Sequence, residues 1–396
     1  MIHCFNPGHE TAVLNASRHY QPAANQVKMQ QELAFLPAWY AEPGDFVWVE
    51  EELTDRFRKD TEDFNLNVQT LSINQCKERA NALSGQSIDL WGVSPQSIYR
   101  FEQIGRQYGL EWHTPVWKEE FRRLGSRITS HDVLVYLVKT IPELNRHLIP
   151  KFVSSREELE EYLVNHPGKW LVKSPFSSSG RGLVWLPPGL PAPSERQVIS
   201  GMLKKQSQVS IEKVWDKVMD FSMHFAIDTK HSIRFVGYSV FQTNEKGAYK
   251  SSSIAAQEIL ESQISRFIPP DLLSTAGNEL LNILQKTYAS CYSGNIGVDM
   301  LVYRTDNEYH LHPCVEINMR KSMGYLAIAL HHKYLHPQTQ GYLHIDYDAQ
   351  PGRILQKQAV LKQQHPAVMD NGRMLSGYLS LCPITETSGY HAYLLC

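Results

Sequence analysis

The chain has 396 residues, more than a single hydrophobic core usually holds, so we expect two or three domains. Its 39 Lys and Arg residues nearly balance 41 Asp and Glu residues, and a net charge of -2 excludes a bulk positive field for nucleic acid or an anionic membrane surface. No apolar run approaches the ~18 residues of a spanning helix, and six scattered Cys residues favour reduced thiols in a cytoplasmic protein.

Residues 1–126 alternate short apolar strands with helices, which is typical of a small, mostly parallel α/β domain. The first strand ends in the turn Asn6-Pro7-Gly8-His9-Glu10. Ligand groups gather where the strands of such a sheet end, so this turn is either a binding loop or a simple reversal with solvated side chains. Strands are predicted over residues 2–5, 45–49, 66–71 and 88–93, and helices over residues 26–31 and 94–107.

The next segment delivers a lysine to a loop of small residues. A strand over residues 169–175 carries Lys173 near its end, and residues 176–183 follow as a Ser/Gly-rich loop. Small residues let successive N–H groups converge on an anion, and Gly180 and Gly182 tolerate positive φ. Lys173 and Arg181 add positive charge. We therefore predict a phosphate flap, with a merely flexible hairpin loop as the alternative; the lysine precedes the glycines, so this is not a Walker A loop.

Strands and one long helix fill the middle of the chain. Asp220 is predicted to open the second of these strands, and residues 249–253 form either a further strand or a loop. Strands are predicted over residues 209–215, 220–227 and 234–243, and helices over residues 129–138, 156–164, 194–205 and 270–290.

A hairpin follows, with strands from residue 295 and from residue 309 and a turn at Asp306-Asn307. If the hairpin is centred on this turn, Arg304 faces Tyr309, Asp299 faces Cys314 and Gly297 faces Glu316. Asp299 and Glu316 then share one face on a diagonal, and Gly297 leaves room for a ligand.

Glu316, Asn318 and Arg320 alternate onto that same face. Carboxylate and amide oxygens suit a hard cation such as Mg²⁺, and a guanidinium suits phosphate. One alternative is an ordinary hairpin with a solvated polar face. A zinc hydrolase using His310, His312 and Cys314 is disfavoured, because neighbouring positions on one strand close a tetrahedral site poorly.

Beyond residue 320 we predict helices over residues 324–334 and 353–364 and two pairing strands, 375–382 and 390–396.

The motifs in their order resemble the ATP-grasp superfamily over about residues 127–330. They are Lys173 at a strand end, the Ser/Gly loop, the strand 211–214, Asp220, Gly297-Val298-Asp299 and Glu316-x-Asn318-x-Arg320. The resemblance implies an α/β fold with an N-terminal pre-ATP-grasp-like domain (1–126), a small lobe with the flap (127–208), and a large lobe with the metal site and the C-terminal strands (209–396).

The resemblance also implies a role for each motif. Arg320 and Lys173 would be catalytic, with Lys173 on the α- and β-phosphates of ATP. Glu212 and the backbone of Lys213 and Val214 would meet adenine, and Asp220 the ribose. The implied flap comprises Ser177, Ser178, Ser179, Gly180, Arg181 and Gly182, and the ligands of Mg²⁺ (or Mn²⁺) are Asp299, Glu316 and Asn318.

Two departures from the family pattern stand out. The family's earlier ATP-contacting lysine has no assigned counterpart, although Arg127 and His131 lie near that region. Some relatives also carry a basic residue just before the metal-binding Asp, where this chain has Ile296-Gly297-Val298.

The implied activity is ligation of a carboxylate to an amine, less often a thiol, through an acyl-phosphate. The alternative is a nucleotide-binding sensor or scaffold. Small-molecule partners are expected, including an amino acid or peptide, with a homodimer as one assembly. Candidate substrate groups, each with a surface role as the alternative, are His9, Glu10, Arg234, Lys250, Lys321 and Ser322.

Overall fold

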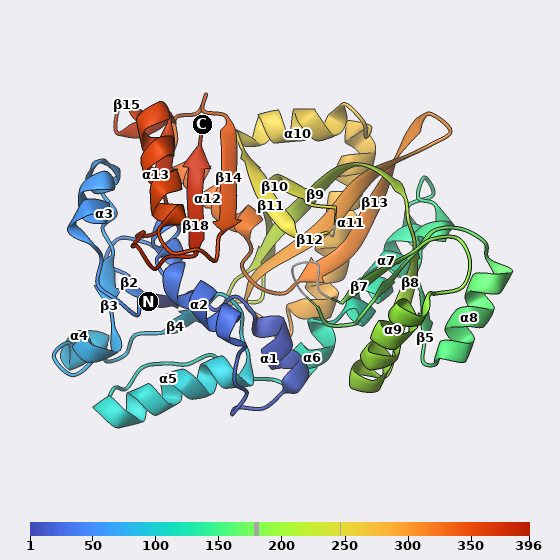
Figure 1. Ribbon diagram of the computed structural model, residues 1–396, viewed down its shortest axis with the longest axis horizontal. Coiled ribbons are helices and arrows are strands. Elements are labelled where there is room, and N and C mark those ends of the chain that lie inside the picture. Colours follow the sequence, from blue (N-terminus) through green and yellow to red (C-terminus); the bar gives the residue numbers. More distant parts are fainter. Residues whose placement is uncertain (178–181, 246) are drawn as a thin grey trace. The chain divides into compact units, whose positions relative to one another are not determined.

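The computed structural model describes residues 1–177, 182–245 and 247–396, which form two compact units. Unit 1 comprises Met1–Lys118, Lys250–Leu260 and Arg320–Cys396, and unit 2 comprises Glu119–Tyr249 and Glu261–Met319. The C-terminal residues therefore share a unit with the N-terminal ones, drawn red and blue in Figure 1. The three-part division at residues 126 and 208 stays a prediction. None of the helices in the described residues is long and apolar enough to cross a membrane.

Unit 1 begins with a parallel sheet, as the alternation of strands and helices predicts. Its strand order is β3-β2-β1-β4. Ser94 Oγ accepts the N–H of Ser97 and so caps the helix that follows β4. The strands are β1 (Ile2–Cys4), β2 (Phe46–Trp48), β3 (Gln69–Leu71) and β4 (Ile88–Leu90). The helices are α1 (His9–Asn15), α2 (Ala24–Glu32), α3 (Asp55–Asp60), α4 (Ala80–Leu83) and α5 (Pro95–Tyr108), with 3-10 turns at Leu36–Trp39, Glu62–Phe64 and Ile73–Gln75.

The rest of unit 1 is an antiparallel sheet in the order β11-β14-β18-β17. Residues 249–253 thus belong to a strand, and the predicted pairing of the last two strands is confirmed. Trp39 Nε1 donates to the carbonyl of Leu381 at 2.8 Å within a core that draws on both ends of the chain. The elements are β11 (Tyr249–Ile254), α12 (Met323–Tyr334), β14 (Gly341–Tyr347), α13 (Arg353–Gln364), β17 (Tyr378–Ser380) and β18 (Tyr390–Leu395), with a small ribbon of β15 (Val368–Asp370) and β16 (Arg373–Ser376).

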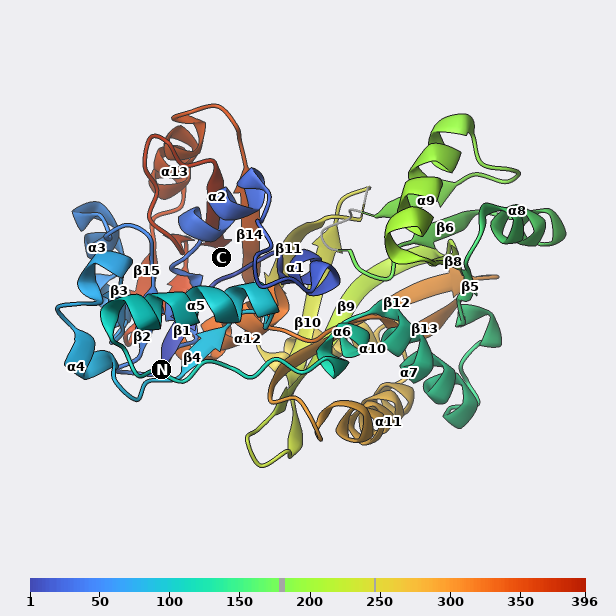
Figure 2. The same cartoon turned by 90° about the horizontal axis from the view of Figure 1, so that it is seen from below.

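Unit 2 contains a small antiparallel sheet in the order β5-β8-β6-β7. Figure 2 shows α8 and α9 beside these strands, where Leu159 and Ile199 are fully buried in an apolar core. The elements are β5 (Lys151–Val153), α8 (Arg156–Asn165), β6 (Trp170–Lys173), β7 (Leu183–Leu186), α9 (Pro193–Gln206) and β8 (Val209–Lys213), with a 3-10 turn at Arg146–Leu148.

The larger sheet of unit 2 has the order β13-β12-β9-β10. Phe221, Met223 and Phe225 alternate on its apolar face and are fully buried. The prediction that Asp220 opens a strand is wrong, because β9 already begins at Asp216. The strands are β9 (Asp216–Ile227), β10 (Ile233–Thr243), β12 (Gly294–Thr305) and β13 (Glu308–Asn318), and the helices are α6 (Glu120–Leu124), α7 (Arg127–Thr140) and α11 (Pro270–Tyr288), with α10 (Gln257–Ser265) between β11 and α11 along the chain.

Candidate functional site

The hairpin of β12 and β13 brings Asp299 directly opposite Glu316. Near the turn the predicted register holds, since Arg304 faces Tyr309. The prediction that Asp299 faces Cys314 and Gly297 faces Glu316 is wrong, because the register shifts between Asp299 and Leu301.

The reason for this shift is visible in the sequence. Pro313 lies in the shifted stretch of β13, which is the edge strand of the sheet, and proline is found in strands at edges and bulges because it has no N–H to donate. The shift spans an even number of residues on each strand, so the predicted common face of Asp299 and Glu316 is confirmed. The two residues are closer than predicted, because directly opposite Cβ atoms lie about 5 Å apart.

These side chains form an oxygen-rich set that fits magnesium. Asn318 Nδ2 donates to Asp299 Oδ2 at 2.9 Å, which turns the amide nitrogen toward one carboxylate. Among the described residues no group of three or more His, Cys, Asp or Glu side chains is arranged to hold a metal ion. Two carboxylates and one amide oxygen are nevertheless what Mg²⁺ commonly takes from a protein, because waters and phosphates complete its shell.

Lys173 ends β6 as predicted, and its partner is Glu212 on the neighbouring strand β8. Lys173 Nζ lies 2.5 Å from Glu212 Oε2, and both side chains are largely buried. Ser210 Oγ donates to the other carboxylate oxygen. Val214, whose backbone is predicted to meet adenine, donates its N–H to the carbonyl of Lys169 at 3.1 Å, so an adenine contact there would use its carbonyl.

The described ends of the Ser/Gly loop are joined to each other. The N–H of Ser174 donates to the carbonyl of Gly182, whose φ is +71°. A Cβ at Gly182 would lie 2.9 Å from Ser177 Cβ, so glycine is required there for both reasons. The positive φ predicted for Gly182 is confirmed. The other predicted flap residues, Ser178, Ser179, Gly180 and Arg181, lie outside the described residues.

Arg127, which the motifs left unassigned, connects the loop base to the carboxylate pair. Its Nη1 donates to the carbonyl of Ser174 at 2.7 Å and to Ser177 Oγ at 2.6 Å, and its Nη2 donates to Glu316 Oε2 at 2.8 Å. The side chain is 8% exposed. The sequence signals were its place before the first predicted helix of the segment and its nearness to the region of the family's earlier ATP-contacting lysine. Neither signal identifies its partners.

The polar face of the larger sheet continues across β9. Asp220, Ser222 and His224 alternate there, and the register sets Ser222 beside Asp299 and His224 beside Gly297. Asp220 accepts hydrogen bonds from Lys217 and Thr243. Ser222 and His224 are buried, and sequence reasoning missed both. Ser222 Oγ and His224 Nε2 lie 2.9 Å apart, within hydrogen-bond distance.

Gly297 makes room for a side chain of the protein. A Cβ at this position would lie 3.1 Å from His224 Cε1. The predicted space for a ligand at Gly297 is therefore filled by the His224 imidazole.

His312 and Cys314, the residues of the zinc alternative, are buried beside the lysine pair. Burial lowers the pKa of His312 to about 4, although the negative charge of Glu212 acts to raise it. Burial also raises the pKa of Cys314. A neutral imidazole and a protonated thiol are the forms that this environment favours. Both line a small cavity together with Arg127, Ser130, His131, Leu134, Pro150, Phe152, Ser210, Glu212 and Val315.

Arg320 belongs to unit 1, where Glu10 in the first turn of α1 holds it. Arg320 Nε lies 2.5 Å from Glu10 Oε1, and its Nη1 donates to the carbonyl of Lys321. Burial alone would raise the pKa of Glu10, but Arg320 and His9 outweigh it, so the pKa lies well below its usual value.

The loop after β1 is itself tightly built. Asn6 Nδ2 donates to the carbonyl of Gly92 at 2.6 Å and Asn6 Oδ1 accepts the N–H of Gly92, which joins the ends of β1 and β4. Lys321 Nζ donates to Asp89 Oδ1 at 2.6 Å, and His3 lies 2.5 Å from the other oxygen of that carboxylate. The side chains of Asn6, Asp89 and Lys321 are therefore held by hydrogen bonds within the fold and are not merely solvated.

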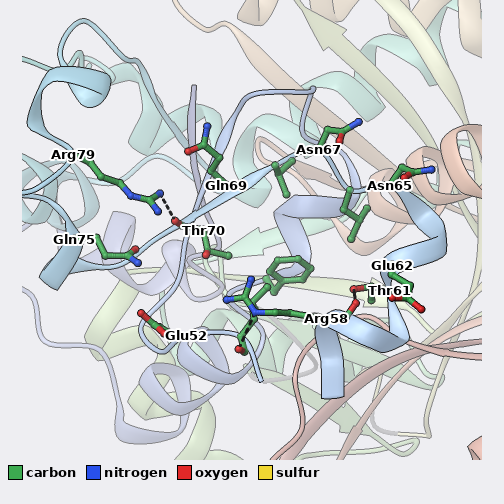
Figure 3. Close-up of a pocket in the computed structure, with 14 residues that line it drawn as sticks. Glu52, Arg58, Thr61, Glu62, Asn65, Asn67, Gln69, Thr70, Gln75 and Arg79 are labelled. Atoms are coloured by element: carbon green, nitrogen blue, oxygen red, sulfur yellow. Dashed lines mark hydrogen bonds between the residues drawn. The ribbon is translucent and has the colours of Figure 1, made fainter. Parts of the chain in front are cut away.

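Unit 1 also has an open cavity of about 450 Å³ near the edge strand β3 (Figure 3). Arg79 Nη1 donates to the carbonyl of Thr70 and Arg58 Nε to that of Leu53. The predicted site residues do not line this cavity.

No family model matches the sequence, and no curated protein matches it. Solved structures do match. One is the biotin carboxylase domain of the Hydrogenobacter thermophilus 2-oxoglutarate carboxylase, solved with MgADP, ADP and bicarbonate, with a TM-score of 0.51, 8% identity, and coverage of 100% of this chain and 85% of that one. Another is the biotin carboxylase of Campylobacter jejuni, solved as a beta-gamma-ATP complex, with a TM-score of 0.51, 10% identity, and coverage of 100% and 86%. At such identities the likeness concerns the fold, and it agrees with the ordered motifs: the chain has the ATP-grasp fold.

Proposed function

We propose that the protein is an ATP- and Mg²⁺-dependent ligase that joins a carboxylate to an amine through an acyl-phosphate. The observation that carries the proposal is the pairing of Asp299 with Glu316 in the unit that also presents Lys173 at the base of the Ser/Gly loop. Neighbours of the same fold that were solved with nucleotides support it.

The chemistry of the reaction suits these residues. A carboxylate is a poor electrophile, and phosphorylation by ATP gives it a leaving group that an amine can displace. Phosphoryl transfer needs positioning and charge neutralisation more than a protein nucleophile. Magnesium, when bound to Asp299, Glu316 and the Asn318 amide oxygen, would neutralise phosphate charge.

The other residues bind, orient and exclude water. Lys173 would bind the α- and β-phosphates, and the loop from Ser177 to Gly182 would cover them and protect the acyl-phosphate from hydrolysis. Arg320 would stabilise the charge on the transferred phosphoryl group. The largely buried carboxylate of Glu10 fixes this guanidinium, which supports a role that depends on orientation.

The reaction is tested by incubating the protein with ATP, Mg²⁺ and pools of amino acids and small carboxylates. We expect ADP release that depends on both a carboxylate and an amine, with a new amide detected by mass spectrometry. Tight nucleotide binding without turnover in any pool would instead support the sensor or scaffold module.

A further inference from the structure

Arg127 is hydrogen-bonded both to the base of the Ser/Gly loop and to a residue proposed to bind magnesium. Its guanidinium is buried, and the three hydrogen bonds of its two terminal nitrogens go to Ser174, Ser177 and Glu316. Its Nε is buried without a hydrogen-bond partner in the described part of the chain. The carboxylate that neutralises it is also one of the two opposed carboxylates proposed for magnesium.

The position of this arginine in its helix is costly. Arg127 is the first residue of α7, where the helix dipole is positive and disfavours a cation. A buried guanidinium also needs a counter-ion. Glu316 therefore offsets both the unfavourable helix dipole and the burial of the charge. When Glu316 no longer pairs with Arg127, the guanidinium needs another anion.

The position of α7 relative to β13 is fixed by hydrogen bonds from backbone N–H groups. Ser130, one helical turn after Arg127, accepts the N–H of Ile317 with its hydroxyl at 2.9 Å. The N–H of Arg127 donates to the carbonyl of Pro175. Because both ends of the contact are tied down, a metal that takes Glu316 cannot be accommodated by sliding the helix; the Arg127 side chain has to turn.

We infer that Arg127 and the metal compete for Glu316, and that the guanidinium released by the metal turns to the phosphates of the nucleotide. This inference rests on the proposed function. Metal alone then binds weakly, because it leaves Arg127 buried without an anion. Metal and nucleotide bind cooperatively, because the phosphates replace the lost carboxylate, and the coupling is reciprocal.

The test measures Mn²⁺ binding by electron paramagnetic resonance, with and without ADP, in the full chain. In the wild type we expect ADP to tighten Mn²⁺ binding about tenfold, within the usual range of coupling between two ligands. In Arg127→Gln we expect Mn²⁺ alone to bind about tenfold tighter than in the wild type, and ADP to bind more weakly.

Arg123→Gln is the matched control. Arg123 is 73% exposed, lies four residues before Arg127 and pairs with Asp132, so both affinities should stay at wild-type values. Arg127→Lys is a second variant that keeps the charge, and it should keep part of the competition.

Equal Mn²⁺ affinity in wild type and Arg127→Gln would overturn the inference while leaving the proposed function standing, provided that the wild type binds ADP. Should Arg127→Gln fail to fold, Arg127→Lys replaces it, and Mn²⁺ affinity without ADP equal to that of the wild type overturns the inference; absence of coupling between Mn²⁺ and ADP in the wild type overturns it as well. A wild type that binds no nucleotide under any condition would instead remove the proposed function.

Discussion

Lys173 and Glu212, which the motifs assign to opposite ends of a nucleotide, are each other's partner, with Nζ and Oε2 2.5 Å apart. Both side chains are largely buried, so each charge depends on the other. A nucleotide phosphate that binds Lys173 would have to share it with this carboxylate.

Replacing Lys173 with Met should lower kcat/KM for ATP by about 100-fold, because one preorganised positive charge at the phosphates is lost. Initial rates of ADP release over a range of ATP concentrations measure this. The control is Lys169→Met, an exposed residue just before the same strand, which should have wild-type rates. A Lys173→Met enzyme with unchanged kcat/KM would contradict the assignment.

Replacing Asp299 with Asn should reduce turnover by about 100-fold and raise the Mg²⁺ concentration needed for half-maximal rate, because one of two opposed carboxylates is lost. The measurement is a Mg²⁺ titration at saturating ATP. Asp306→Asn at the exposed hairpin turn makes the same chemical change, and it should behave like the wild type because asparagine tolerates the φ of +49° at that residue. Identical Mg²⁺ profiles for the two variants would refute the metal assignment.

Stability should fall as the pH drops from about 6.5 to 4. Burial lowers the pKa of His391 to about 4, and that of His312 likewise to about 4, so the folded state keeps both neutral while the unfolded chain takes up protons first. Stability from these groups is complete above the unfolded pKa and is lost on acidification. The loss at pH 5 is about 2 kcal/mol for each histidine.

Urea unfolding at pH 7 and at pH 5 checks this effect. His391→Phe removes one of the titrating groups and should show a smaller loss between the two values. The carboxylates of Asp89, Glu10 and Asp45, whose pKa is lowered, stabilise the fold above about pH 4 and lose that stabilisation only below it, outside this window. An unchanged pH dependence in His391→Phe would count against the buried neutral histidine.

Gly92→Ala should destabilise the protein by about 1–3 kcal/mol, because the new Cβ would lie 2.4 Å from Cγ of the buried His9 ring. Gly201→Ala is the opposite case. Gly201 lies inside α9, and beyond its neighbours in that helix no atom of the described residues lies within 4 Å of its Cβ position, so alanine there should stabilise by about 0.5–1 kcal/mol. Thermal unfolding of both variants measures the two signs, and equal shifts would contradict the close approach of Gly92 to His9.

Much of the architecture follows from local patterns. The parallel N-terminal sheet, the strand ending at Lys173 and the hairpin turn at Asp306-Asn307 were predictable, because strand alternation and turn chemistry act over a few residues. The common face of Asp299 and Glu316 followed for the same reason.

The exact cross-strand pairs of the β12–β13 hairpin could not be predicted from local patterns. A shift of register beside Pro313 depends on how an edge strand meets its neighbour, and the prediction of Cys314 opposite Asp299 failed there. Proline was the available signal, since it has no N–H for the ladder.

The sequence by itself determined the residue types of the site and their order along the chain, because side-chain chemistry and strand period are local properties. Tertiary structure alone decided which charges neutralise one another. Arg127 finds Glu316 and Arg320 finds Glu10 across 189 and 310 residues, respectively. Pairing over such distances depends on how the chain packs, and no local pattern records it.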